Sequence, residues 1–139
     1  TVEGITLSGG EPLQQAGAVA SLLQQVRQRT ALSVILFSGY TLPEIRRIPS
    51  GRKVLNLTDI LIAGRYDRSR RVARGLLASS NQTIHFFSRR YGPADLESVP
   101  EAEVLIGEDG SVLVTGIDPP PIKPAGQTGG SPGKTLPPR

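Results

Sequence analysis

Residues 4–15 (GITLSGGEPLQQ) join an apolar run to helix-forming residues through Ser8, two glycines, a glutamate and a proline. Gly9 and Gly10 have no Cβ, so the backbone of this turn can approach a ligand closely. Backbone amides just before a helix attract anions, whereas the carboxylate of Glu11 attracts an ammonium group. A ligand with both an amine and a carboxylate, such as an amino acid moiety, would satisfy both. The alternative is a tight strand-to-helix turn in which Glu11 stabilises the helix dipole.

Two later apolar runs are also followed directly by small or polar residues. Residues 33–37 (SVILF) precede Ser38 and Gly39, and residues 59–63 (DILIA) precede a glycine and Arg65. The carboxyl ends of parallel strands meet at one edge of a sheet, and ligands bind there. We therefore expect all three strand ends on one rim, with Arg65 as the arginine that reaches the site.

The elements that must position these residues follow from the hydrophobic pattern. Apolar residues recur at helical spacing after Pro12, and the continuous run at 33–37 is typical of a strand covered on both faces. The pattern predicts strands at residues 4–7, 33–37, 59–63 and 83–88, helices from residue 11 and at 42–48, and a hairpin of 103–106 with 111–115. Alternation of strands and helices favours an α/β fold with a parallel sheet.

Composition narrows the classes of protein. The 139 residues suit one domain with a core, and no apolar stretch is long enough for a membrane helix. The start also lacks the order of a secretory signal, so the cytoplasm is the default location. The chain has no cysteine and one histidine, which excludes disulfides, thiolate metal ligands and a multi-histidine metal site. The net charge of +4 permits anionic partners without requiring them.

Two segments have an unusual composition. Residues 65–74 (RYDRSRRVAR) carry five arginines, which suit either a docking surface for an acidic partner or a solvated basic loop. We expect a loop or a loose helix over residues 65–77. Nucleic acid is disfavoured, because Tyr66 is the one aromatic residue among them and no nucleic-acid-binding motif accompanies them. Residues 117–139 hold seven prolines and four glycines, and we expect this tail to be disordered.

Three single residues have both a structural and a functional interpretation. His85 lies within a predicted strand, where a packed side chain is favoured over a catalytic base. Tyr40 could stack on an adenine or simply pack at a strand end. Asp59 opens a strand and could equally cap it or pair with an arginine.

Four stretches together resemble the radical S-adenosylmethionine (SAM) superfamily, and in particular the small activases of anaerobic ribonucleotide reductase and their single-cluster relatives. They are GITLSGGEP, SVILFSGYT, TDILIAGRYD and GLLASSNQTIHFF, in that order, and EVLIGEDGSVLVTG is similar to the hairpin that closes many of these chains. The resemblance covers roughly residues 3–116. It implies a partial (β/α) barrel with parallel strands for residues 1–116, plus the hairpin, followed by the tail at 117–139.

The resemblance also implies a function and a site. Members bind SAM and cleave it reductively at a [4Fe–4S] cluster, and activases then place a radical on a glycyl radical enzyme. Ser8, Gly9, Gly10 and Glu11 would meet the methionine amino group and neighbouring atoms, and Ser38 and Gly39 would lie beside the cofactor. Ser80 and Asn81 would lie further round the rim. A protein substrate and an electron donor such as flavodoxin or ferredoxin are the implied partners.

The chain departs from this family in its cysteines. The family's CxxxCxxC loop follows a strand that would precede residue 1, so the sequence resembles the C-terminal part of a longer protein. This polypeptide alone is expected to be inactive. Gly64-Arg65 also replaces an acidic turn of the family, so no site role is assigned to Asp67. The rival hypothesis is a non-catalytic α/β binding or scaffold module with a basic docking surface, while Glu11 disfavours an ordinary phosphate- or nucleotide-binding domain.

Overall fold

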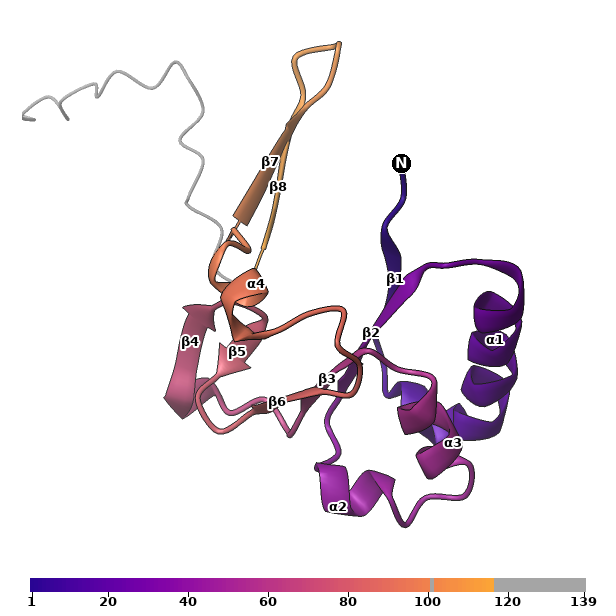
Figure 1. The fold of residues 1–139 in the computed structure, drawn as a ribbon. Coiled ribbons are helices and arrows are strands. Elements are labelled where there is room, and N and C mark those ends of the chain that lie inside the picture. The colour runs from indigo at the N-terminus through magenta and orange to yellow at the C-terminus, as the bar shows by residue number, and fades with distance from the viewer. Residues whose placement is uncertain (101, 117–139) are drawn as a thin grey trace, which may run out of the picture.

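A computed structural model of the chain describes residues 1–100 and 102–116, and its centre is a four-stranded sheet of order β1-β2-β3-β6 (Figure 1). β1 (Gly4–Leu7), β2 (Ser33–Ser38) and β3 (Ile60–Ala63) are parallel. β6 (Thr83–Phe86) pairs with β3 in the antiparallel direction. The fold is therefore mixed α/β, and its fourth strand departs from the expected all-parallel arrangement.

The register of the parallel strands places their carboxyl ends together. Leu7 pairs with Leu36 of β2, and Ser38 at the end of β2 pairs with Ala63 at the end of β3. We call this edge of the sheet the rim. The prediction that the three strand ends share one rim is confirmed.

Two helices cover one face of the sheet (Figure 1). The chain enters the first through a 3-10 turn, η1 (Pro12–Gln15), and continues as α1 (Ala16–Arg29). The buried stripe of α1 packs on the alternate side chains of β2 and β3 that face it, in a cluster that includes Val19, Ala20, Leu23, Val34, Leu36 and Leu61. α3 (Gly51–Asn56) lies beside α1 and adds Val54 and Leu55 to the same cluster.

The helix predicted at 42–48 is shorter than expected. Thr41 is the N-cap of α2 (Leu42–Ile45). Its hydroxyl accepts a hydrogen bond from the Glu44 amide, and the Glu44 carboxylate accepts one from the Thr41 amide. The chain then turns and begins α3, which the sequence pattern did not predict. A six-residue helix shows too few apolar positions for a 3.6-residue period to be recognised.

The other face of the sheet is covered by a hairpin and a short helix. The hairpin pairs β4 (Arg71–Arg74) with β5 (Leu77–Ser79) after a 3-10 turn, η2 (Arg68–Arg70), and we call it the basic hairpin. The expectation of a loop or loose helix at 65–77 was therefore wrong from residue 71 onward, whereas residues 65–67 do form a loop. Gly75 has a φ of 57° in the turn between the two strands. This turn was not predicted from the arginine-rich sequence.

This second face has its own apolar cluster. Ile60, Ile62, Ile84 and Phe86 point into it from β3 and β6, and α4 (Pro93–Glu97) contributes the buried Leu96. The strands β2 and β3 are thus covered on both faces, as their continuous apolar sequences predicted.

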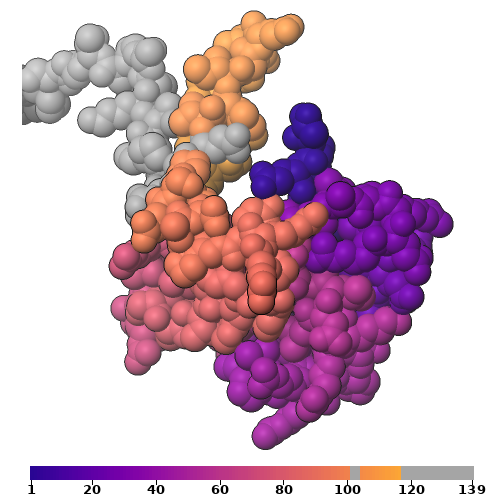
Figure 2. Space-filling view, viewed as in Figure 1, coloured from indigo at the N-terminus to yellow at the C-terminus, as the bar shows by residue number. Residues whose placement is uncertain are grey.

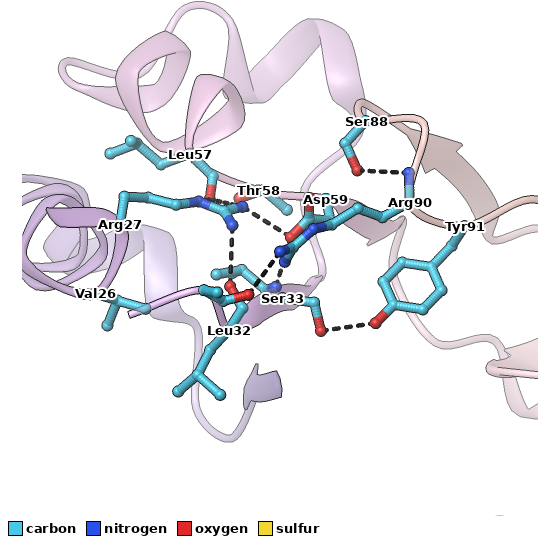
Figure 3. A network of polar contacts seen from close by, with 12 residues as sticks. Val26, Arg27, Leu32, Ser33, Leu57, Thr58, Asp59, Ser88, Arg90 and Tyr91 are labelled. Atoms are coloured by element: carbon cyan, nitrogen blue, oxygen red, sulfur yellow. Dashed lines mark hydrogen bonds and ion pairs between the residues drawn. The ribbon is translucent and has the colours of Figure 1, made fainter. Parts of the chain in front are cut away.

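The amino edge of the sheet is held by polar contacts around Asp59 (Figure 3). The buried Asp59 carboxylate accepts from the Val34 amide at 2.7 Å and from Arg27 at 2.8 Å. Burial would raise the pKa of Asp59, but hydrogen bonds from Ser88, from Arg27 and from a backbone amide outweigh it and lower this pKa. Asp59 is therefore the partner of an arginine, one of its two predicted roles.

A second hairpin stands away from the body (Figures 1 and 2). β7 (Ala102–Ile106) pairs with β8 (Val112–Gly116) in the antiparallel direction, and Gly110 has a φ of 80° in the turn. The predicted hairpin is confirmed, and we call it the apolar hairpin. The predicted disordered tail at 117–139 lies outside the described residues.

Candidate functional site

The glycines of the opening turn, residues 8–11, face open space. Gly9 and Gly10 have φ angles of 82° and 54°, and no heavy atom lies within 4 Å of the position that a Cβ would take on either residue. Both residues are exposed. The turn therefore presents bare backbone at the rim, and a side chain at either glycine would be strained by its backbone conformation.

Glu11 reaches across the rim to the end of the neighbouring strand. Its Oε1 accepts a hydrogen bond from the Ser38 hydroxyl at 2.8 Å, and its Oε2 accepts from the Gly39 amide at 2.7 Å. Oε1 also accepts from the Leu13 amide at 3.0 Å and so caps the 3-10 turn that follows. Oε1 thus has both of its lone-pair sites occupied, whereas Oε2 can accept one further hydrogen bond, which leaves room for an ammonium group. Glu11 thus combines the structural role with a position suited to ligand binding.

Ser38 and Gly39 hold this carboxylate in place. The Ser38 side chain is buried, and its hydroxyl accepts from the Tyr40 amide at 3.1 Å while donating to Glu11. Its hydrogen atom is therefore committed to the protein. A Cβ at Gly39 would lie 3.4 Å from Glu11 Oε2, so a larger residue would press on the carboxylate.

Arg65 lies at the rim but is held by Glu44. Its two terminal nitrogens donate to the two Glu44 oxygens at 3.0 and 3.2 Å, and the guanidinium lies 5.8 Å from the centre of the Tyr40 ring. The hydrogen bond from Arg65 lowers the pKa of Glu44 to about 2, helped by the Thr41 amide. Sequence reasoning missed Glu44, because nothing in the local pattern relates it to an arginine 21 positions later.

The segment SSNQ supports the end of β3 from the adjacent loop. The Asn81 side chain donates to the Arg65 carbonyl at 2.8 Å, and Gln82 donates to the Gly64 carbonyl at 3.0 Å. Ser80 is exposed, and its amide donates to the Arg70 carbonyl. Asn81 is thus brought to the rim with Arg65. Gln82 shares this supporting role and was not among the predicted site residues.

Ser8 lines a recess to which Glu11 does not contribute. With Gly9 it lines this recess of about 240 Å³ against Pro12, Val19 and Leu22 of the following helix. The rim therefore combines an apolar recess beside α1 with a polar bridge from Glu11 to Ser38 and Gly39.

Comparison with known proteins decides the family. The family model described as 4Fe-4S single cluster domain matches residues 1–85, which include the rim and all four strands of the central sheet except the last residue of β6. The chain belongs to the 4Fe-4S single cluster domain family. Searches of curated proteins and of solved structures gave no significant match.

The cluster that names this family does not fit the residues of this chain. The 139 residues contain no cysteine, and thiolates are the usual ligands of such a cluster. Within residues 1–100 and 102–116, no group of three or more histidine, aspartate or glutamate side chains could hold a metal ion. The thiolate ligands of such a cluster are therefore absent from this sequence.

The remaining candidates in this family member have structural partners. His85 stacks on Phe87 with ring centroids 6.2 Å apart, and its Nε2 lies 2.9 Å from the Thr83 hydroxyl. Burial, and then the charge of Arg46, lowers the pKa of His85. Asp67 accepts from Ser69 and caps η2. These observations agree with a packed His85 and with no site role for Asp67.

In the part of the chain that the structure describes, no helix has the length and apolar character needed to cross a membrane.

Proposed function

We propose that this chain supplies the SAM-binding part of a radical SAM enzyme of the activase type, arranged as a partial (β/α) barrel. Ser8, Gly9, Gly10 and Glu11 would hold the methionine end of SAM, with Ser38 and Gly39 beside it. Arg65 and Asn81 would border the ligand from the end of β3. Bound SAM supplies a sulfonium centre, and its reductive cleavage needs a [4Fe–4S] cluster, whose ligands this chain lacks.

The observation that carries this proposal is the pairing of open backbone with a fixed carboxylate. The paired glycines leave space in front of the turn, and three hydrogen bonds hold the Glu11 carboxylate at the rim. Glu11 is suited to accept from the ammonium group of an amino acid moiety, while backbone amides of the turn are suited to its carboxylate. Membership of a 4Fe–4S family supports the connection to iron–sulfur chemistry.

Isothermal titration of the 139-residue chain with SAM tests the proposal. We expect heat from the wild type and none from Gly10→Val, because a β-branched residue is strained at positive φ and fills the open space. Gly110→Val is the matched control: Gly110 also has positive φ and open surroundings, but it lies in the apolar hairpin. Equal heats from wild type and Gly10→Val would overturn the proposal.

The same titration can test which end of the ligand is recognised. Methylthioadenosine keeps the adenosine and sulfur of SAM but lacks the amine and carboxylate. If Glu11 binds the ammonium group, this compound binds at least about tenfold more weakly than SAM, the loss expected for one charge-assisted hydrogen bond. Equal affinity for both compounds would contradict the assignment of Glu11.

The basic hairpin favours a second candidate function, a docking surface for an acidic protein. Arg68 and Arg70 of the preceding η2 and Arg74 of β4 are exposed, and η2 follows directly from the rim. In the activase proposal such a partner would be a glycyl radical enzyme, another protein substrate or an electron donor such as flavodoxin or ferredoxin. A chain that captures an acidic protein in pull-down but gives no heat with SAM would favour the scaffold function.

A further inference from the structure

A pocket whose lining residues include no carboxylate lies between the α2–α3 connection and the end of β6. Its volume is about 430 Å³, and it is lined by Arg46, Arg52, Leu55, Asn56 and Phe87. Leu55 is buried, whereas the other four residues are exposed and can be reached by a ligand. The volume lies within the range of small-molecule sites, about 300–1,000 Å³. We call this site the arginine pocket.

The described chain leaves the positive charge of this pocket unneutralised. Arg52 Nε donates to the Arg46 carbonyl at 3.3 Å, which ties the side chain across the turn between α2 and α3. Within residues 1–100 and 102–116, the terminal nitrogens of Arg52 and the guanidinium of Arg46 have no hydrogen-bond or ion-pair partner. Glu44 and Asp59, the acidic residues nearest to them in the sequence, are paired with other arginines. Guanidinium groups bind phosphate and carboxylate through paired hydrogen bonds, so the pocket is suited to an anion.

The wall of the pocket at β6 is aromatic. Phe87 directly follows β6, and its amide donates to the Asp59 carbonyl at 2.8 Å, which extends the pairing with the neighbouring chain segment. Phe87 is 40% exposed, and the ring of His85 stacks on its ring at an interplanar angle of 7°. Burial, and then the charge of the nearby Arg46, lowers the pKa of His85, so this arginine lies beside the aromatic pair. An exposed ring held by a parallel neighbour offers a flat surface on which a second planar ring can stack.

Asn56 adds a group that can recognise the edge of a planar ring. It is the last residue of α3, it is exposed, and its carboxamide has no hydrogen-bond partner in the described part of the chain. A carboxamide carries an acceptor oxygen and two N–H donors, which match the adjacent donors and acceptors of a nucleobase. The same pocket thus offers two anion-binding groups, one stacking surface and one amide.

We propose that the arginine pocket binds a nucleotide. Its phosphate groups bind Arg46 and Arg52. The base stacks on Phe87, and Asn56 forms hydrogen bonds with the base edge. An inorganic anion would use only the arginines, and an uncharged aromatic compound would use only the ring and the amide. Phe87 is the one aromatic lining residue, so the pocket suits a single base better than a strand of nucleic acid. The pocket shares no lining residue with the recess at the rim, so nucleotide binding here is independent of the proposed function.

Isothermal titration of the 139-residue chain with three compounds tests the class of ligand. We expect ADP to bind at least about tenfold more tightly than pyrophosphate, which lacks the base, and than adenosine, which lacks the phosphates. An absence of heat with ADP would overturn the proposal. Pyrophosphate with the affinity of ADP would overturn the nucleotide in favour of a plain anion site. Adenosine with the affinity of ADP would overturn the role of the two arginines.

Paired substitutions test the arginines. Arg46→Gln combined with Arg52→Gln is expected to raise the dissociation constant for ADP at least about tenfold, because both phosphate-binding groups are lost. Arg47→Gln combined with Lys53→Gln is the matched control, since these exposed neighbours in the sequence lie outside the pocket lining and remove the same charge. The control should raise the dissociation constant by less than about threefold. Equal weakening by both pairs would show binding to general surface charge and overturn the site.

The ring of Phe87 is tested separately. Phe87→Leu keeps an apolar side chain but removes the stacking surface, so it should weaken ADP binding at least about fivefold and leave pyrophosphate binding unchanged. Unchanged affinity for ADP would contradict base stacking in the pocket. Circular dichroism of each variant verifies that it is folded.

A cross-test separates this pocket from the rim, since ADP and SAM share adenosine. Gly10→Val should leave ADP binding unchanged, and the pair of Arg46→Gln and Arg52→Gln should keep the heat expected with SAM. Loss of SAM binding in Gly10→Val with ADP binding retained is the expected result. ADP binding that is lost in Gly10→Val and kept in the arginine variant would place ADP at the rim and overturn the arginine pocket.

Discussion

At the scale of single residues, the carboxylate of Glu11 joins the ends of β1 and β2. It accepts hydrogen bonds from one hydroxyl and two backbone amides. Glu11→Gln keeps the shape but offers one acceptor oxygen, so at least one amide would face an NH₂ group. We expect a loss of about 1–3 kcal/mol in the free energy of unfolding, measured with urea. Glu97→Gln is the control and should change it by less than about 0.5 kcal/mol; equal effects would contradict a structural role for Glu11.

The ion pair of Glu44 and Arg65 makes a pH-dependent contribution to stability. The pKa of Glu44 falls from 4.5 to about 2 on folding, mainly through the hydrogen bond from Arg65. A lowered carboxyl pKa stabilises the folded state above the unfolded pKa, and this contribution disappears as pH falls through the folded value. The difference in melting temperature between wild type and Glu44→Gln should therefore be constant above about pH 5 and shrink towards pH 2. A difference that does not change with pH would contradict this pairing.

The rim residues show what single-residue patterns can predict. The position of Ser8, Gly9, Gly10, Ser38 and Gly39 at the rim could be predicted, because small residues directly after an apolar strand are a local signal. The partners of Arg65 could not be found in this way. Glu44 meets Arg65 only because two strand ends lie side by side, and that contact depends on the tertiary fold.

At the scale of elements, Arg27 ties α1 to the strands beneath it. Its guanidinium donates to the Leu32 and Leu57 carbonyls and to the buried Asp59 carboxylate. Arg27→Gln would leave that carboxylate without its counter-charge, and we expect a loss of about 2–4 kcal/mol in the free energy of unfolding. Arg29→Gln in the same last turn of α1 is the control, with an expected change below about 0.5 kcal/mol. Similar losses for both variants would show that helix charge, and not the buried pair, is responsible.

The elements that the sequence predicted well have long or continuous apolar patterns. The parallel strands, α1 and the apolar hairpin fall in this group, because period and turn chemistry identify them locally. The basic hairpin was missed because its charged residues conceal two short strands that pack with half-buried residues on the second face. The direction of β6 could not be read from its apolar pattern, since antiparallel and parallel strands show the same run.

At the scale of the whole molecule, stability is concentrated in the centre of the sheet and falls towards the apolar hairpin. β2 and β3 are packed on both faces: the apolar cluster that contains α1 and α3 covers one face, and the cluster that contains Leu96 of α4 covers the other. The apolar hairpin pairs with itself and stands outside both clusters. The proposed site at the rim thus rests on the most densely packed part of the described chain, whereas the apolar hairpin is its least supported part.

Hydrogen exchange should display this gradient. Amides in the interior of β2 and β3 are expected to exchange only on global unfolding, because no smaller opening exposes them. Amides of β7 and β8 should exchange much faster, because this hairpin pairs only with itself in the described chain and lies outside both apolar clusters. Mass spectrometry of exchanged peptides measures the difference. Protection of β7 equal to that of β2 would contradict the gradient.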